Sequence, residues 1–147
     1  MVKRILVFCL IADLLLVSAC TKKTKTMQVV FSDPLSDSLY VEILLTDTDE
    51  IVGMDFNIVY QSQDWLFQKI TESSDSLIVT PTDNVIRCIY ESENGEKLAK
   101  RVLTVEFSRC GKPINTSGVY VEINECYAAG SEQRDIPCKI EYMQKNG

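Results

Sequence analysis

The side chains best able to do chemistry in this 147-residue chain are six cysteines and 21 aspartates and glutamates, because the sequence contains no histidine. Without histidine, neither a Ser-His-Asp triad nor a Cys-His pair can be assembled for nucleophilic catalysis. The sequence also contains no G-x-G-x-x-G or P-loop run that would bind a nucleotide phosphate. These features predict a protein that is not an enzyme, with no catalytic residues and no cofactor.

Two groups of carboxylates still deserve an interpretation. Glu91, Glu93 and Glu96 surround an Asn94-Gly95 turn. A carboxylate pair could serve glycoside hydrolysis, although carboxylates beside a turn are usually just solvated. The Asp47–Glu50 loop could offer oxygen ligands to Ca²⁺, but the rest of an EF-hand loop is absent, which favours a plain turn. We therefore predict no metal site.

Four cysteines lie in the part of the chain that we expect to fold: Cys88, Cys110, Cys126 and Cys138. An even number in an exported domain favours disulfides, with three connectivities open, and an all-cysteine zinc site is the weaker alternative. Cys126 ends one expected strand and Cys138 begins the next. The base of such a hairpin would bring their Cα atoms within the roughly 4.4–6.8 Å that a disulfide needs. We predict a Cys126–Cys138 disulfide, with Cys88–Cys110 as the second.

The first twenty residues are typical of an export signal. Lys3-Arg4 precede an apolar run from Ile5 to Val17, which is too short for a committed transmembrane span. The run ends in Leu16-Val17-Ser18-Ala19-Cys20, which resembles a bacterial lipobox. The resemblance implies removal of residues 1–19, lipidation of Cys20, and an anchored, extracytoplasmic protein of the bacterial cell envelope. The alternative is an ordinary signal peptide with a chance cysteine at its boundary.

Residues 20–26 then form the lipidated cysteine and a short polar tether, whose lysines could contact anionic headgroups or simply be solvated. We expect a single domain over residues 27–147. That domain has 10 basic and 20 acidic residues, because five of the 15 basic residues and one of the 21 acidic residues precede it. Its net charge of about −10 argues against nucleic acid, whose phosphates need a basic face.

The elements that must position these side chains are short strands. Eight or nine short runs of apolar or alternating residues, about ten residues apart, are separated by polar turns. This pattern predicts an all-β fold, a β-sandwich or jelly roll. The runs are Met27–Phe31, Leu39–Leu45, Ile51–Tyr60, Trp65–Ile70, Leu77–Thr80, Val85–Tyr90, Val102–Ser108, Val119–Asn124 and Cys138–Met143.

The Ile51–Tyr60 run is the clearest of these strands. Its even-numbered residues are apolar from Val52 to Tyr60, whereas Asp55 and Asn57 fall on the opposite side with Gly53 and Val59. The alternation predicts a strand with one buried side and one side that presents Asp55 and Asn57 outward.

The same run also resembles part of a known family. Ile51–Tyr60, Asp83–Arg87, Arg101–Phe107 and Gly118–Cys126 are similar, in order, to segments of the cohesin domain, the jelly-roll module that receives dockerins in cellulosomes. The resemblance covers roughly residues 27 to 143. It implies that Asp55, as the Asp of the family's Asp-Phe pair, helps to contact a dockerin-like partner.

The sequence therefore favours a membrane-anchored, non-catalytic, cohesin-like module that binds a dockerin-like protein or a polysaccharide, with Asp55 and Asn57 in the partner-binding face. A polysaccharide could stack on the aromatic residues Trp65, Tyr60, Tyr90, Tyr120 and Tyr127, although Trp65 resembles a core residue. The alternative is a structural or envelope-assembly lipoprotein that has kept only the fold.

Overall fold

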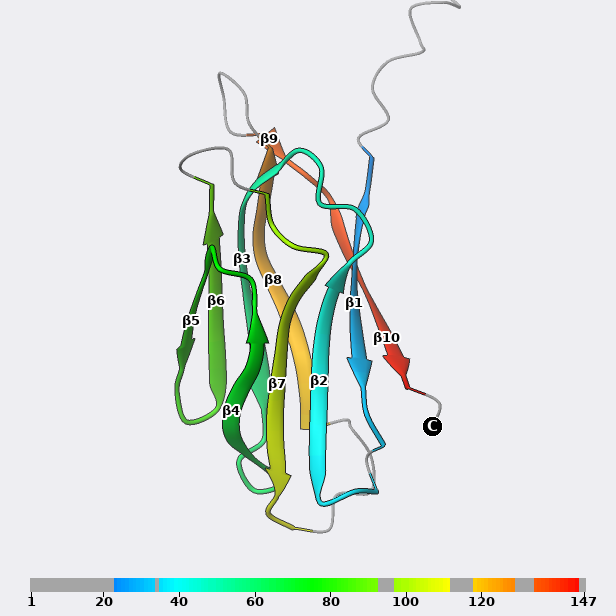
Figure 1. Cartoon of the computed structure of the whole chain (residues 1–147), viewed down its shortest axis with the longest axis vertical. Helices are drawn as coiled ribbons and strands as arrows, with labels where there is room; N and C mark the ends of the chain where they lie inside the picture. Colours follow the sequence, from blue (N-terminus) through cyan, green and yellow to red (C-terminus); the bar gives the residue numbers. More distant parts are fainter. Residues whose placement is uncertain (1–22, 34, 93–96, 112–117, 129–133, 146–147) are drawn as a thin grey trace, which may run out of the picture.

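The computed structural model describes residues 23–33, 35–92, 97–111, 118–128 and 134–145. In these ranges the chain forms a β-sandwich of two five-stranded sheets, with no strand crossing between the layers (Figure 1). The strands in chain order are β1 Lys25–Phe31, β2 Ser38–Leu45, β3 Ile51–Tyr60, β4 Trp65–Ser73, β5 Leu77–Pro81, β6 Val85–Glu91, β7 Arg101–Arg109, β8 Val119–Ala128, β9 Arg134–Asp135 and β10 Cys138–Gln144.

We call the two layers the β2–β7 sheet and the β3–β8 sheet. The β2–β7 sheet has the strand order β10-β1-β2-β7-β4, and the β3–β8 sheet has the order β5-β6-β3-β8-β9. Neighbouring strands are antiparallel except β1 and β10, which pair in parallel from Lys25 opposite Cys138 to Phe31 opposite Gln144. The all-β sandwich that the sequence predicts is confirmed.

The core lies between the sheets and is built by the alternation seen in the sequence. On β3, the side chains of Met54, Phe56 and Ile58 are buried completely or almost completely. Phe107 of β7 reaches them from the other sheet and packs against Tyr60 with ring centroids 5.1 Å apart. Each large apolar side chain buried in this way contributes roughly 1.5–3 kcal/mol. Strand alternation and burial therefore fix which side of β3 faces solvent.

Most expected strands match the structure to within one or two residues, and the differences have local causes. β4 continues to Ser73, through residues expected to form a loop, because it pairs with β7 along its length. β1 begins at Lys25, inside the expected tether. The Lys25 ammonium is buried there and lies 2.9 Å from the Asp47 carboxylate, which anchors the start of the strand. β9 has only two residues and leaves no periodic signal.

The Asn94-Gly95 pair, which indicates a hairpin, lies outside the described residues. The strands before and after it do not form a hairpin with each other, because β6 pairs with β3 and β5 whereas β7 pairs with β2 and β4.

The expected signal peptide and Cys20 also lie outside the described residues. Within the described ranges, no helix has the length and apolar character needed to cross a membrane.

Candidate binding face

The outer face of the β3–β8 sheet carries both residues that the sequence proposes for partner binding. β3 is the central strand of this sheet, between β6 and β8. From Met54 onward its odd-numbered residues Asp55, Asn57 and Val59 are half-buried by their neighbours, while the even-numbered residues point into the core. At the start of the strand this order is reversed, because the register shifts between Ile51 and Gly53, so Ile51 is buried and Val52, expected on the buried side, is only half-buried. Asp55 and Asn57 therefore lie in the middle of the face formed by β5, β6, β3 and β8.

Asp55 does not project freely, because it bridges three strands. Its carboxylate accepts a hydrogen bond of 2.7 Å from Nη2 of Arg87 on β6 and one of 3.0 Å from Nδ2 of Asn124 on β8. The ion pair with Arg87 is the main reason that the pKa of Asp55 is lowered, and Asn124 adds to this effect, while partial burial opposes it. The carboxylate therefore stays ionised and fixes the position of Arg87.

A bulge in β8 brings Asn124 to Asp55. Asp55 pairs with Glu125 and Phe56 pairs with Ile123, so Asn124 is the extra residue on β8. Bulges commonly change the direction of a side chain in this way. Sequence reasoning missed Asn124 and Arg87. Their positions depend on strand order and register, and the only sequence signal is the outward position of Arg87 in its alternating strand.

Asn57 holds an acceptor that the described residues do not satisfy. Its strand neighbours are Arg87 on β6 and Glu122 on β8. The side-chain Oδ1 is buried and has no hydrogen-bond partner in the described part of the chain. A buried acceptor left without a donor costs about 1–3 kcal/mol.

Apolar side chains surround this polar centre. Ile78 on the edge strand β5 has 66% of its surface exposed, and its strand neighbour Ile89 pairs in turn with Asp55. Further along the sheet, the exposed Tyr120 pairs with Val59. The central part of a protein interface is enriched in aromatic residues and arginine and depleted in aspartate and glutamate. Arg87 and Tyr120 are therefore the residues of this face that best suit such a centre.

The face is also acidic. The four strands β5, β6, β3 and β8 contain one basic residue, Arg87, and four acidic ones, which gives a net charge of −3. The acidic residues are Asp55, Glu91, Glu122 and Glu125. Since Arg87 is already paired with Asp55, the remaining charge favours a partner that brings basic groups.

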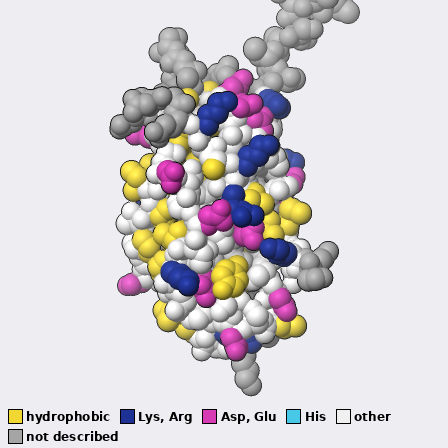
Figure 2. All heavy atoms as spheres, in the orientation of Figure 1, with side chains coloured by type: hydrophobic (Ala, Val, Ile, Leu, Met, Phe, Trp, Pro, Cys, Tyr) yellow, Lys and Arg dark blue, Asp and Glu magenta, His cyan; other side chains and the backbone are white. Residues whose placement is uncertain are grey.

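The outer face of the β2–β7 sheet differs because its charges neutralise one another. Glu42 lies between Lys145 at 3.4 Å and Arg101 at 3.8 Å, and Arg101 also lies 3.1 Å from Glu72. Figure 2, which views the molecule as in Figure 1, shows Lys and Arg side chains beside Asp and Glu across the middle of this face. Such a mosaic of exposed ion pairs is well solvated and gives little net attraction to a charged partner.

The aromatic residues proposed as a sugar-stacking platform do not form one. Trp65, Tyr60 and Tyr90 are buried in the core, and only Tyr120 and Tyr127 reach the surface. Trp65 is completely enclosed because it begins β4 with its ring between the sheets. The interpretation of Trp65 as a core residue is thus confirmed.

The two expected disulfides are not present. Cys88, Cys110, Cys126 and Cys138 are all free thiols. Cys88 is completely buried in β6, whereas Cys110 is exposed beyond β7 in the other sheet, so this pairing is wrong for the structure. The hairpin argument for Cys126 and Cys138 is also wrong, because β10 pairs with β1 and not with β8. The two thiols nevertheless line the same pocket between the sheets, and each shifts the pKa of the other.

In the Asp47–Glu50 loop, which was considered for Ca²⁺, the Asp47 carboxylate is already paired with two lysines of the same chain. Asp47 accepts ion pairs of 2.9 Å from both Lys25 and Lys23, and these lower the pKa of its carboxyl group. Among the described residues, no group of three or more acidic or cysteine side chains is placed to hold a metal ion.

Comparison with known proteins identifies the fold. No family model and no curated protein sequence matches the chain. Among solved structures, the cohesin of an OlpC cohesin–dockerin complex from Clostridium thermocellum superposes with a TM-score of 0.61 at 12% identity, over 86% of this chain and 98% of that one. The cohesin of an OlpA cohesin–dockerin complex from the same organism gives 0.58 at 17% identity, over 83% and 98%. A non-cellulosomal cohesin from the archaeon Archaeoglobus fulgidus gives 0.59 at 12% identity, over 84% and 92%. The chain therefore folds as a cohesin-like domain.

Proposed function

We propose that this protein is a lipid-anchored, non-catalytic module that binds a dockerin-like protein partner on the face formed by β5, β6, β3 and β8. The main support is the group of polar residues around Asp55 in the centre of the sheet. Arg87 and Asn124 both hydrogen-bond to the Asp55 carboxylate, and the neighbouring Asn57 has an unsatisfied acceptor. Two of the structurally similar cohesins were solved in complexes with dockerins, which favours the same class of partner here.

The rigidity of the sheet favours binding. Arg87 keeps 57% of its side chain exposed while Asp55 holds its guanidinium in place, so little side-chain entropy remains to be lost on association. Arginine and large apolar residues are frequent hot spots when a partner excludes water from them. Arg87 and Ile78 are therefore the residues from which we expect the largest contributions.

A protein partner fits the face better than a polysaccharide. Sugar binding of the kind considered above requires several exposed rings, and three of the five candidate aromatics are buried. The exposed Ile78, the acidic charge and the unsatisfied amide of Asn57 favour a surface with apolar, basic and hydrogen-bond-donating groups.

The lipid anchor rests on the lipobox-like sequence that ends at Cys20. Several acyl chains, at about 0.8 kcal/mol for each buried CH₂ group, would hold the domain stably at a membrane. The location that follows is the extracytoplasmic side of a bacterial envelope.

Matched surface variants can test the binding face. Ile78→Asp changes the exposed β5 side chain on the proposed face, and Leu66→Asp changes a comparably exposed side chain, 51% accessible, on β4 of the other sheet. We expect a dockerin-bearing or basic partner from the source organism's secretome to be captured by the wild type and by Leu66→Asp but not by Ile78→Asp.

Equal capture by both variants would place the interaction elsewhere on the domain. If no partner depends on either surface, the alternative of an envelope-assembly lipoprotein that keeps only the fold is the better account. Circular dichroism and thermal unfolding of both variants would show that each substitution leaves the sandwich folded.

A further inference from the structure

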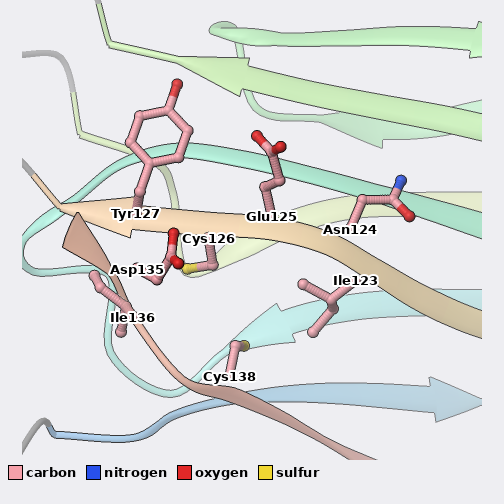
Figure 3. Close-up of a pocket in the computed structure, with 8 residues that line it drawn as sticks. All are labelled: Ile123, Asn124, Glu125, Cys126, Tyr127, Asp135, Ile136 and Cys138. Atoms are coloured by element: carbon pink, nitrogen blue, oxygen red, sulfur yellow. The ribbon is translucent and has the colours of Figure 1, made fainter. Parts of the chain in front are cut away.

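A pocket opens where β8 of one sheet approaches β10 of the other. It has a volume of about 470 Å³, and both Cys126 and Cys138 line it (Figure 3). The binding face described above does not use either thiol. Two thiols that line one pocket can react in turn with the same small molecule.

The backbone holds the two cysteines together. The N–H of Ile136 donates a hydrogen bond of 2.8 Å to the carbonyl oxygen of Cys126, and Asp135 pairs with Tyr127. Only Pro137 then separates Ile136 from Cys138, where β10 begins. The chain therefore crosses from the β3–β8 sheet to the β2–β7 sheet within this short stretch and brings both cysteines to the same pocket.

We propose that Cys126 and Cys138 form a thiol–disulfide exchange site, in which Cys138 attacks an external disulfide and Cys126 resolves the mixed disulfide. The product is a reversible covalent link between β8 and β10, and hence between the two sheets. This inference does not depend on the binding function proposed above.

The surroundings assign different roles to the two sulfur atoms. Cys138 is half-buried at the pocket, whereas Cys126 is 5% exposed. The Cys126 thiol and the backbone N–H of Met27 both lower the pKa of the Cys138 thiol, while burial opposes them. The neighbouring Cys138 sulfur and burial raise the pKa of Cys126, against the smaller effect of the Lys25 charge. The thiolate therefore forms on the more accessible sulfur.

The reaction is balanced with any small disulfide, written RSSR, as the oxidant. The Cys138 thiolate attacks one sulfur of RSSR, which forms a Cys138–SR bond and expels RS⁻. The Cys126 thiol then loses its proton and attacks the Cys138 sulfur, which forms the Cys126–Cys138 bond and expels a second RS⁻. Two protein thiols are oxidised, one disulfide is reduced to two thiols, and the protons pass to the leaving groups or to solvent.

The other two described thiols provide internal controls. Burial raises the pKa of the Cys88 thiol to about 12, and its side chain is completely enclosed, so it should not react. Cys110 is exposed, so it should react with RSSR only as far as a mixed disulfide.

The experiment treats the reduced full-length chain, in detergent, with glutathione disulfide, quenches with acid and blocks free thiols by alkylation. Trypsin together with a glutamate-specific protease cuts at Glu122 and Glu125, between Cys110 and Cys126, and at Arg134, between Cys126 and Cys138. Mass spectrometry then distinguishes the disulfide-linked peptides of Cys126 and Cys138 from glutathionylated and alkylated ones.

We expect a Cys126–Cys138 linkage in the wild type, stable glutathionylation of Cys138 in Cys126→Ser, and at least about tenfold slower modification of Cys126 in Cys138→Ser. Dithiothreitol should reverse the wild-type linkage. If Cys126 and Cys138 stay alkylated while Cys110 carries glutathione, or if Cys126 reacts as fast in Cys138→Ser as Cys138 does in Cys126→Ser, the proposal is wrong. Thermal unfolding of each variant checks that its fold is intact, and wild-type peptide mapping decides the linkage if a variant does not fold.

Discussion

Tyr127 lies directly over Gly53, so closely that a Cβ atom built on Gly53 would be 1.9 Å from the Cζ atom of the tyrosine ring. The two residues are strand neighbours on β8 and β3. The Tyr127 hydroxyl continues across β3 and donates a hydrogen bond of 3.2 Å to Glu91 on β6. The ring covers backbone that the glycine would leave bare and ties three strands together. Any side chain at Gly53 must displace it.

Replacing Gly53 with alanine should therefore destabilise the domain, although alanine suits a strand better than glycine does. We expect a loss of roughly 1–3 kcal/mol, typical of overpacking, measured by urea denaturation. In a Tyr127→Ala background the same substitution should cost less than about 0.5 kcal/mol, because the clash is gone. Equal costs in the two backgrounds would show that the ring moves aside freely.

The ion pair of Asp55 should make stability depend on pH. Because Arg87 lowers the pKa of Asp55 in the folded state, the ionised carboxylate stabilises the fold above the unfolded pKa of about 3.9. That contribution is lost as the pH falls through the folded pKa. The free energy of unfolding, measured by urea denaturation, should be about 1 kcal/mol higher for wild type than for Asp55→Asn at pH 7. This difference should shrink towards zero near pH 2. A difference that stays constant over this range would contradict the assignment.

Asp55 and Arg87 should act as one unit in partner binding. Each alanine substitution should weaken binding by about 1–3 kcal/mol, because each removes a charge-assisted hydrogen bond from the centre of the interface. The double variant should lose clearly less than the sum, since either substitution alone already breaks the pair. Calorimetry with the captured partner measures all three affinities. Unchanged affinity in the single variants would remove this pair from the interface.

Replacement of Cys20 with alanine tests the anchor. A lipidated protein should lose its diacylglyceryl attachment site and its normal processing, so the variant should be released or remain at precursor size. Membrane fractionation with immunoblotting measures both properties. A variant of mature size that still fractionates with the membrane would contradict lipidation at this residue.

The fold could be predicted because its signal is local. In β3 the alternation from Met54 to Tyr60 reports which side is buried, and the strand bounds of Ile51 and Tyr60 follow from the turns around them. The same alternation places Asp55 and Asn57 on the outer face. What it cannot report is which strands lie beside β3. Arg87 and Asn124 meet Asp55 only because β6 and β8 flank it and because β8 carries a bulge.

The two wrong predictions, a hairpin at Asn94-Gly95 and a hairpin between Cys126 and Cys138, also arise because the sequence does not show which strands are neighbours. Asn94-Gly95 and the Cys126–Cys138 segment both look like connections between paired strands, since short links usually join neighbours. In a sandwich, a short link can also pass from one layer to the other. β6 to β7 and β9 to β10 both do so. The proximity of Cys126 and Cys138 was thus predicted from the wrong geometry.

The parallel pairing of β1 with β10 decides how the domain would be presented above a lipid surface. Lys25 begins β1 opposite Cys138, which lines one pocket with Cys126, so the end of the sandwich that carries Tyr127 is the end where the chain enters. Four residues separate Cys20 from Lys25, so their Cα atoms are at most about 17 Å apart when the chain is extended. In a protein lipidated at Cys20, Tyr127 would then lie nearer the membrane than Tyr120. A bulky partner of a lipidated protein would therefore meet less steric hindrance from the headgroups at the Tyr120 end of the face.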